Sequence, residues 1–340
     1  MDVVSTVTLL GVFQQIHSLD TFFLNMFFPR VVTFDTKEIA FDKLSKSRKL
    51  APLVSPMVAG KVNKQAGGIL SSFSPAYVKP KDVVDPQMLL ERMPGEAIGG
   101  ELSPAQRRNA VIVQLLTDQD ESITRREEWM AAQAVLTGKI TAEMEGQGTY
   151  EVDFQRKAEN NITLTGAAQW TGLDPETSTK PIEDIETWAD QAEGIVNIAV
   201  MDKLTWALLR KFKCIKDAID KTLAQKSSVE LGPNVKKEAA WVGNLNGIDL
   251  YVYKGTYEEN DVEVNIMPDY TFVLGSTFSD GVRAYGGIQD VKANANGIVS
   301  GARYPKNFFT DDPSVEYLMT QSAPLPVTPR PNAFVVVKVG

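Results

Sequence analysis

The chain has 340 residues with a net charge of −8, and 43% of the residues are hydrophobic and 23% charged, a composition that excludes general disorder. The negative charge argues against a general nucleic-acid binder, because affinity for a phosphate backbone comes mostly from clustered Lys and Arg. One cysteine, Cys214, and one histidine, His17, cannot supply a zinc or iron–sulfur site, and no apolar run approaches the roughly 20 residues of a membrane span.

The first thirty residues contain an aromatic cluster. Phe22, Phe23, Phe27 and Phe28 surround an asparagine, and the segment stops at Pro29. So many large apolar side chains must be buried. Two partners remain open at this point, the core of the same chain and the surface of another chain.

Residues 54–86 indicate a long hairpin whose two extended arms meet at Gly67-Gly68. By two-residue alternation, one arm places three valines on one face, and the returning arm does the same with an isoleucine and two aromatics. These face residues are Val54, Val58, Val62, Ile69, Phe73 and Tyr77. Five prolines remove ladder donors, and a two-stranded hairpin is marginal in water. We therefore expect the hairpin to pack against something else.

Residues 104–137 predict one long helix. Ser103 and Gln106 form a capping box, Pro104 occupies the first helical position and Gly138 can end the helix. At 1.5 Å per residue the helix would be about 51 Å long. The apolar positions at helical spacing are Ile112, Leu116, Ile123, Met130 and Ala134, and the expected polar faces carry Arg107, Arg108, Asp118, Asp120, Arg125 and Glu128.

The remainder predicts an α+β unit. Strands flank residues 145–148, a short helix opens at Pro181, and a buried strand covers 195–200. One helix capped by Asp202 should continue through residue 220. Strands follow, broken at Asn246-Gly247 and near 258–261, and the tail segments 316–325 and 333–340 also favour strands.

Catalytic motifs are missing from the sequence. Gly60-Lys61 and Gly138-Lys139 lack the Ser or Thr of a phosphate loop, and Gly146-Gln147-Gly148 lacks the third glycine of a dinucleotide fingerprint. His17 has no nucleophile motif beside it. Two groups of acids could in principle serve hydrolysis or bind a hard cation, but solvated charge is the simpler interpretation. They are Asp118, Asp120 and Glu121, and Asp311 and Asp312. We predict no catalytic residue, cofactor or metal.

Seven segments, VSPMVAG, FSPAYVKPK, DPQMLLERMP, AENNIT, WALLRKFK, GARYPKN and TQSAPL, occur in an order that resembles the major capsid (head) proteins of lambda-type phages. The resemblance extends over nearly the whole chain. It implies the Hong Kong 97-type capsid fold, which is α+β and comprises an N-terminal arm, an extended E-loop hairpin, a long spine helix, a peripheral domain and an axial domain. The implied ranges are 1–35 for the N-terminal arm, 36–102 for the E-loop region, 103–180 for the spine helix and peripheral domain, 181–312 for the axial domain, and 313–340 for strands that return to the peripheral domain.

The resemblance also implies a function. The chain would assemble with itself into hexamers and pentamers of an icosahedral tailed-phage head, formed in the host cytoplasm, which encloses double-stranded DNA without specific binding and matures by expansion. Implied partners are a separate scaffolding protein, because no charged helical preface of roughly a hundred residues precedes the arm, a portal protein, and a decoration protein at threefold sites. No membrane is implied.

The implied contact residues lie on the two arms. On the E-loop they are Val58, Lys61, Lys64, Gly67, Gly68, Phe73 and Tyr77, and on the N-terminal arm Phe22, Phe23, Phe27 and Phe28. Some relatives crosslink an E-loop lysine to a neighbour, but lambda-type shells use a decoration protein instead, so we do not expect crosslinking here. Two alternatives are an encapsulin-like compartment of the same fold and, in a different class, a cytoplasmic hydrolase that uses the acidic groups.

Overall fold

The structure is a computed structural model. It describes residues 4–13, 15–16, 19–43, 69–85, 103–144, 146, 148–225, 238–259, 261–295, 297, 300–310 and 315–340. Several residues singled out in the sequence lie outside these ranges: His17, Val54, Val58, Lys61, Val62, Lys64, Gly67, Gly68, Asp311 and Asp312. Within the described ranges, no helix combines the length and apolarity needed to cross a bilayer.

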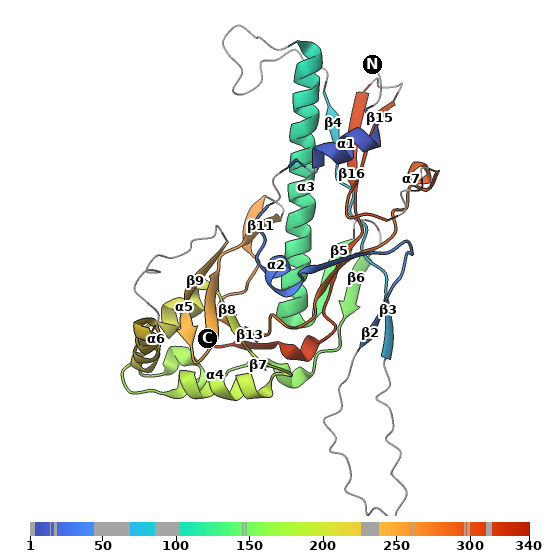
Figure 1. Cartoon of the computed structure of the whole chain (residues 1–340). Coiled ribbons are helices and arrows are strands. Elements are labelled where there is room, and N and C mark those ends of the chain that lie inside the picture. The colour runs from blue at the N-terminus through green and yellow to red at the C-terminus, as the bar shows by residue number, and fades with distance from the viewer. Residues whose placement is uncertain are drawn as a thin grey trace, which may run out of the picture.

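The long helix α3 (Pro104–Thr137) runs through the molecule, as predicted (Figure 1). The Ser103 hydroxyl accepts from the Gln106 amide, and the Gln106 side chain accepts from the Ser103 amide in return. Gly138 ends the helix at φ 76°. The side chain of Arg156 donates to the carbonyls of Ala134 and Val135 in the last turn (2.9 and 2.6 Å), and the Ala134 carbonyl also accepts from the Gly138 amide at 3.2 Å. Local capping therefore sets both ends of α3.

Gly138→Ala should lower the free energy of unfolding by about 2 kcal/mol. A left-handed conformation costs an L-residue roughly 1–2 kcal/mol, and a Cβ here would also lie 2.7 Å from the Cβ of Arg156. Gly146→Ala is the matched control, since Gly146 has φ 74° but nothing within 4 Å of the added atom. Denaturant unfolding of the two variants should show the larger loss at Gly138. An equal loss would mean that contact with Arg156 contributes nothing.

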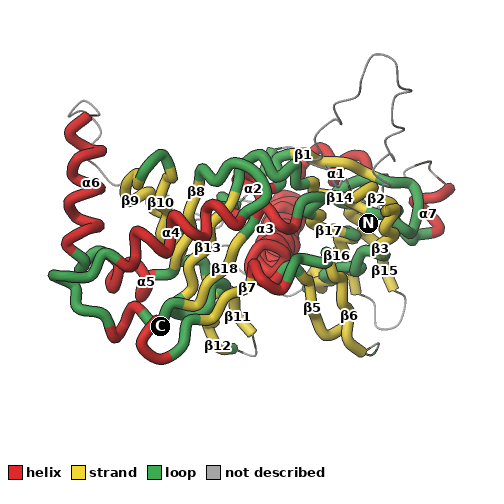
Figure 2. The backbone as a smooth tube through the Cα atoms, turned by 90° about the horizontal axis from the view of Figure 1, so that it is seen from below, coloured by secondary structure: helices red, strands yellow, loops and turns green. Residues whose placement is uncertain are grey.

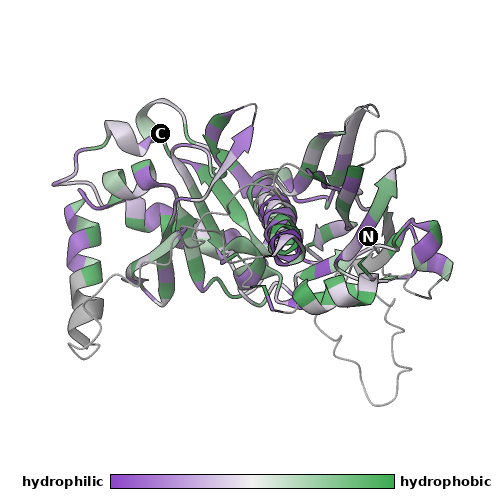
Figure 3. Cartoon of the chain, turned by 90° about the horizontal axis from the view of Figure 1, so that it is seen from above, coloured by the Kyte–Doolittle hydropathy of each residue, from purple (hydrophilic) through white to green (hydrophobic). Residues whose placement is uncertain are grey.

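The largest sheet in the described part of the chain has six strands in the order β7-β18-β13-β8-β10-β9. Their bounds are β7 (Asn161–Thr163), β8 (Ile198–Met201), β9 (Ala239–Leu245), β10 (Ile248–Tyr253), β13 (Thr271–Gly275) and β18 (Val335–Lys338). Strands β8 and β10 are parallel, as are β7 and β18. Along these strands hydrophobic residues predominate (Figure 3).

Three helices cover one face of this sheet: α4 (Lys180–Gln191), α5 (Lys203–Leu209) and α6 (Lys213–Gln225) (Figure 2). Side chains of these helices and of the sheet share one hydrophobic core that includes Trp170 and Trp188. Asp202 caps α5 as predicted, but the single helix expected from residue 203 to 220 is wrong. The chain turns at 210–212, where Phe212 is fully buried between two exposed lysines. Burial of this aromatic offsets the loss of one helical turn.

A three-stranded sheet lies beside the other half of α3, with the order β15-β16-β4. The helix α1 packs on β15 and on α3 (Figure 1). Leu9 of α1, Leu116 of α3 and Leu318 of β16 share a small hydrophobic core. The bounds here are α1 (Thr6–Phe13), β4 (Lys81–Val84), β15 (Tyr304–Thr310) and β16 (Val315–Gln321). Residues from three of the expected chain ranges thus combine in one sheet.

Smaller pairings complete the fold. The order β1-β14-β17 forms one sheet, and the pairs β2-β3, β5-β6 and β11-β12 form two-stranded ribbons. Their bounds, with the two short helices, are α2 (Phe23–Phe27), β1 (Arg30–Thr33), β2 (Ile39–Lys43), β3 (Ile69–Phe73), β5 (Lys139–Met144), β6 (Gly148–Asp153), β11 (Thr256–Glu259), β12 (Val262–Asn265), β14 (Val282–Tyr285), α7 (Val291–Ala295) and β17 (Pro324–Val327).

Strand β3, in the returning arm of the expected hairpin, pairs with β2: Ile39 is opposite Phe73 and Lys43 is opposite Ile69. The sequence did not predict this partner. Residues 39–43 contain no proline that would remove a ladder donor. The first arm of the expected hairpin and its turn at Gly67-Gly68 lie outside the described residues, so this part of the hairpin stays a prediction.

The tail forms strands as predicted, and these strands join two different sheets. Strand β16 joins β15 and β4, whereas β18 is inserted between β7 and β13 in the six-stranded sheet. The assignment of residues 313–340 to the peripheral domain stays a prediction. A run of three valines suits a central strand that is covered on both faces.

Candidate functional site

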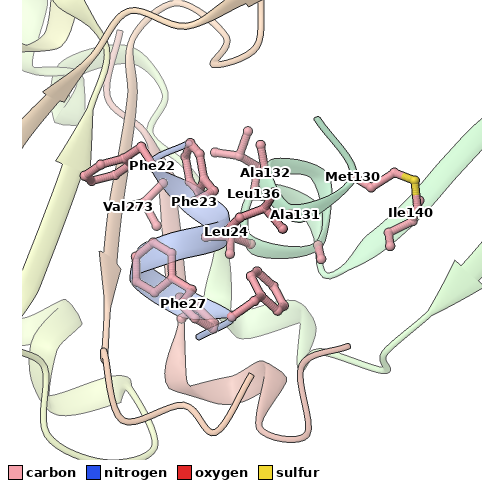
Figure 4. Packing of buried hydrophobic residues seen from close by; sticks show 14 of the residues in the cluster. Phe22, Phe23, Leu24, Phe27, Met130, Ala131, Ala132, Leu136, Ile140 and Val273 are labelled. Carbon is pink, nitrogen blue, oxygen red and sulfur yellow. The ribbon is translucent and has the colours of Figure 1, made fainter. Parts of the chain in front are cut away.

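The aromatic cluster of the N-terminal segment lies in the core of its own chain (Figure 4). Phe23, Phe27 and Phe28 are fully buried and Phe22 retains 8% exposure. They pack on α3 and on the second face of the six-stranded sheet; the ring centres of Phe23 and Tyr253, for instance, are 4.8 Å apart. The structure thus selects the first of the two alternatives, and these side chains are not a free surface for a neighbouring subunit.

Glu128 on α3 holds this segment in place. Its carboxylate accepts hydrogen bonds from the amides of Phe22, Phe23 and Leu24 at 3.0, 2.7 and 2.9 Å. The Tyr253 hydroxyl donates to the same group at 3.2 Å. Glu128 is only 2% exposed, so its expected place on a polar face of the helix is wrong. Burial raises the pKa of Glu128, and the three amide donors and the tyrosine oppose that rise.

A cavity of about 210 Å³ adjoins this anchor, lined by Asp20, Thr21, Phe22, Asn25, Met26, Glu238 and Ala239. Glu238 is half-buried, and its carboxylate faces two other acids, Glu128 and Asp20. Burial first, and then the charges of Glu128 and Asp20, raise the pKa of Glu238 to about 7, while Arg125 acts to lower it. Three acidic side chains therefore lie near this cavity, and partial protonation of Glu238 lowers the repulsion between their charges.

Glu238→Gln should change the pH dependence of stability. The pKa of Glu238 is higher in the folded chain than in the unfolded one, so its contribution favours folding at low pH and is lost as pH rises from about 4.5 to about 7. Glutamine mimics the protonated form. We expect wild type and variant to be equally stable at pH 4, and the variant to gain on the order of 1 kcal/mol at pH 8, because solvent screens a half-exposed group. Parallel unfolding curves at both pH values measure this, and a variant less stable at pH 8 would contradict it.

Arg303 is a second anchor between α3 and the tail strands. Its guanidinium donates to Asp120 at 2.7 Å, to Glu127 at 2.6 Å and to Thr124 at 3.1 Å, all on α3. Tyr285 on β14 also donates to Glu127 at 3.1 Å. Burial acts to lower the pKa of Arg303, but Glu127 and Asp120 outweigh it and the net direction is upward. The guanidinium stays charged.

Two further pairs connect α3 to the β15-β16-β4 sheet. Arg108 donates to both carboxylate oxygens of Glu316, at 2.9 and 2.6 Å. The Gln119 amide donates to Asp82 at 2.6 Å and accepts from Thr320 at 2.6 Å. Arg108 was expected on a polar face, and its side chain is only 11% exposed. Part of the polar surface of α3 therefore makes internal contacts, whereas Asp118 and Arg125 are exposed.

The described end of the E-loop region rests on the body of the chain. The ring of Phe73 meets that of Phe154 at 5.6 Å, edge to face. Tyr77 donates to Gln321 and accepts from the Gln289 amide at 3.2 Å. Both side chains are half-buried, and their contact with a neighbour stays a prediction. The other five implied E-loop residues lie outside the described ranges.

Two of the described acidic residues that could serve hydrolysis, both on α3, are engaged in ion pairs. Asp120 is paired with Arg303, and Glu121 with Arg125 one helical turn away at 3.3 Å. Among the described residues no group of three acids, histidines or cysteines could hold a metal ion. The contacts of Glu128 and Arg303 have a structural role, because they fasten α3 to the N-terminal segment and to the tail strands. We call α3 with these two contacts the junction. Neither anchor was identified from the sequence, because its partners lie more than 100 positions away.

Comparisons with known proteins agree along the whole chain. A family model described as phage major capsid protein E matches residues 5–339. The chain is 40% identical to the major capsid protein of Escherichia phage lambda and 41% identical to that of Escherichia phage N15, in each case over 100% of both chains. The crystal structure of a putative capsid protein of a prophage in E. coli CFT073 matches with 33% identity and a TM-score of 0.80, covering 100% of both chains.

Proposed function

The chain belongs to the family of phage major capsid protein E, and from this premise we propose that it assembles into hexamers and pentamers of an icosahedral head that encloses double-stranded DNA. It is a lambda-type major capsid protein with the Hong Kong 97-type fold, a structural component of the virion shell and not an enzyme. The single observation that carries the proposal is full-length identity of about 40% to phage capsid proteins, without a gap in coverage at either end.

We expect contacts between subunits at strands whose edges are unpaired within the described part of the chain. The β2-β3 ribbon has no third strand in the described part, and an isolated ribbon is marginal in water. We propose that neighbouring subunits stabilise it, and that expansion during maturation moves this ribbon around the rigid junction at α3. A separate scaffolding protein, a portal and a decoration protein at threefold sites are the proposed partners.

Negative-stain microscopy of the expressed chain, alone and with a co-expressed scaffolding protein, tests the proposal. We expect closed shells in at least one condition. Small discrete oligomers under both would count heavily against it. Nucleic acid packaged in purified virions would separate a head from an encapsulin-like compartment, which no specific observation favours here. Neither does any observation favour the hydrolase.

A further inference from the structure

Charge is distributed unevenly on the two sides of β8. Residues 181–197, before the strand, contain five acids and no Lys or Arg. Residues 203–217, after it, contain five Lys or Arg and one acid. In a chain of net charge −8, the second stretch is unusual. Two segments of opposite sign therefore follow each other on the same sheet layer.

The acidic stretch borders a groove with a volume of about 490 Å³ between α4 and the β9–β10 turn. Its floor is apolar, formed by Ile182, Ile185, Ala189, Val196, Leu245 and Ile248. Glu186 and Asp190 line it as well, and both are exposed. Ile195, between two lining residues, is 74% exposed. This is a surface with an apolar centre and a negative border.

The groove's acids are available for a partner. Asp184 and Glu193 are paired with Lys180 and Lys157. Glu186 only accepts from the Asn246 amide at 3.2 Å, and neither it nor Asp190 forms an ion pair with any described residue.

The cationic stretch forms a corner at the α5–α6 turn. Arg210, Lys211 and Lys213 are exposed there, and none of them forms an ion pair within the described part of the chain. The Lys213 amide donates to the Pro175 carbonyl at 2.9 Å, and buried Phe212 fixes the turn. That contact brings exposed Glu176 near the corner, Asp217 follows on α6, and the charge of Glu183 also acts on Cys214 beside Lys213. Within the described residues none of these acids forms an ion pair with the three cations.

The corner and the groove are separate surfaces that share no residue. Val196 precedes β8 and the β9–β10 turn precedes β10, and these strands are parallel. The groove is therefore at their amino ends, whereas α5 begins after the carboxyl end of β8. No ion pair joins the two surfaces within one copy. A contact between two different surfaces of identical chains is heterologous, and it generates a ring when the rotation between successive copies closes.

We propose that the Arg210–Lys213 corner of one copy docks in the Glu186–Asp190 groove of a second copy, and that this contact joins neighbouring subunits around each ring. The inference rests on the proposed shell function and names the surfaces that function would use. The apolar floor supplies buried area, and the charges set orientation and exclude the reverse pairing.

Charge reversal tests the contact. Lys211→Glu with Lys213→Glu, and separately Glu186→Lys with Asp190→Lys, should each raise the protein concentration needed for assembly at least about tenfold, because like charges would then face each other. The fourfold variant that carries all these changes should assemble again, with the signs exchanged. Light scattering measures the threshold, and microscopy identifies the products. If each double variant lost assembly and the fourfold variant did not recover it, the inference would be overturned.

A mixture of the two double variants gives a sharper result. Alternating copies place only opposite charges in contact, so a ring of six can form with every contact matched. A ring of five must contain at least one mismatched contact. The mixture should therefore yield hexameric rings or open and tubular products in place of closed shells. Equal recovery of fivefold vertices would refute the ring contact.

The control is Lys79→Glu with Lys292→Glu, which changes the net charge equally at exposed positions outside both surfaces. Circular dichroism should show native folding in every variant. Loss of assembly in the control as large as in the corner variant would overturn the inference. If wild type assembles and all variants match it, the inference fails while the proposed function stands. If wild type never assembles, both fail.

Discussion

Glu128→Ala is expected to lower the free energy of unfolding by about 3–5 kcal/mol and to release the N-terminal segment. The substitution removes the carboxylate that accepts from three buried amides, those of Phe22, Phe23 and Leu24. Each unsatisfied buried donor costs about 1–3 kcal/mol, and partial rearrangement keeps the sum below the simple total. Denaturant unfolding measures the loss, and limited proteolysis should cut the chain before residue 30.

Glu128→Gln separates charge from hydrogen bonding at the same site. Glutamine keeps the shape and one acceptor oxygen but turns an amide group toward backbone donors, so we expect an intermediate loss of about 1–2 kcal/mol. Glu121→Ala, on an exposed part of the same helix, should cost less than about 0.5 kcal/mol. If Glu128→Ala unfolded like wild type, the N-terminal segment would be held by its aromatic side chains alone.

Arg303→Ala is expected to cost about 3–5 kcal/mol, the loss typical of a buried charge left without its partner. Glu127 is 3% exposed and would keep only the Tyr285 hydroxyl as a donor, and Asp120 would lose its ion pair. Thermal or denaturant unfolding measures the change. Arg303→Lys should recover only part of it, because an ammonium group cannot reproduce three separate guanidinium contacts.

A combined variant tests the physical reason for that loss. Arg303→Met with Glu127→Gln removes both members of the closest pair, 2.6 Å apart, and should be more stable than Arg303→Met alone. A double variant as unstable as the sum of its parts would show that packing around Arg303, and not the unpaired carboxylate, carries the cost.

The two anchors have a common consequence. Each fastens a segment that is distant in the sequence to α3 through buried charge, and buried charge is costly to separate. For the proposed shell, this makes the junction a body that moves as one unit. Rearrangement then falls to the segments beyond it, among them the β2-β3 ribbon, which has no third strand in the described part of the chain.

Elements controlled by local chemistry were predictable. The bounds of α3 follow from Ser103, Pro104 and Gly138, all within one turn of the ends they set. Alternation and turn residues located most strands, including both tail segments. The apolar stripe of α3 was also correct, since Leu116 and Ile123 are fully buried. The family resemblance, confirmed over the full length, provided the function that local patterns could not.

Predictions that depended on distant partners failed or stayed open. A carboxylate on a helix, such as Glu128, is ordinarily a solvated charge, and only the approach of three amides from residues 22–24 makes it an internal anchor. Likewise β3 takes its partner from residues 39–43, and β18 finds its place between two strands far away in the chain. The amino-acid sequence by itself determined where α3 begins and ends and which family the chain belongs to. The tertiary structure alone decided which strands pair and which charges are buried, because pairing and desolvation are set by contacts between segments that lie more than 25 and often more than 100 residues apart.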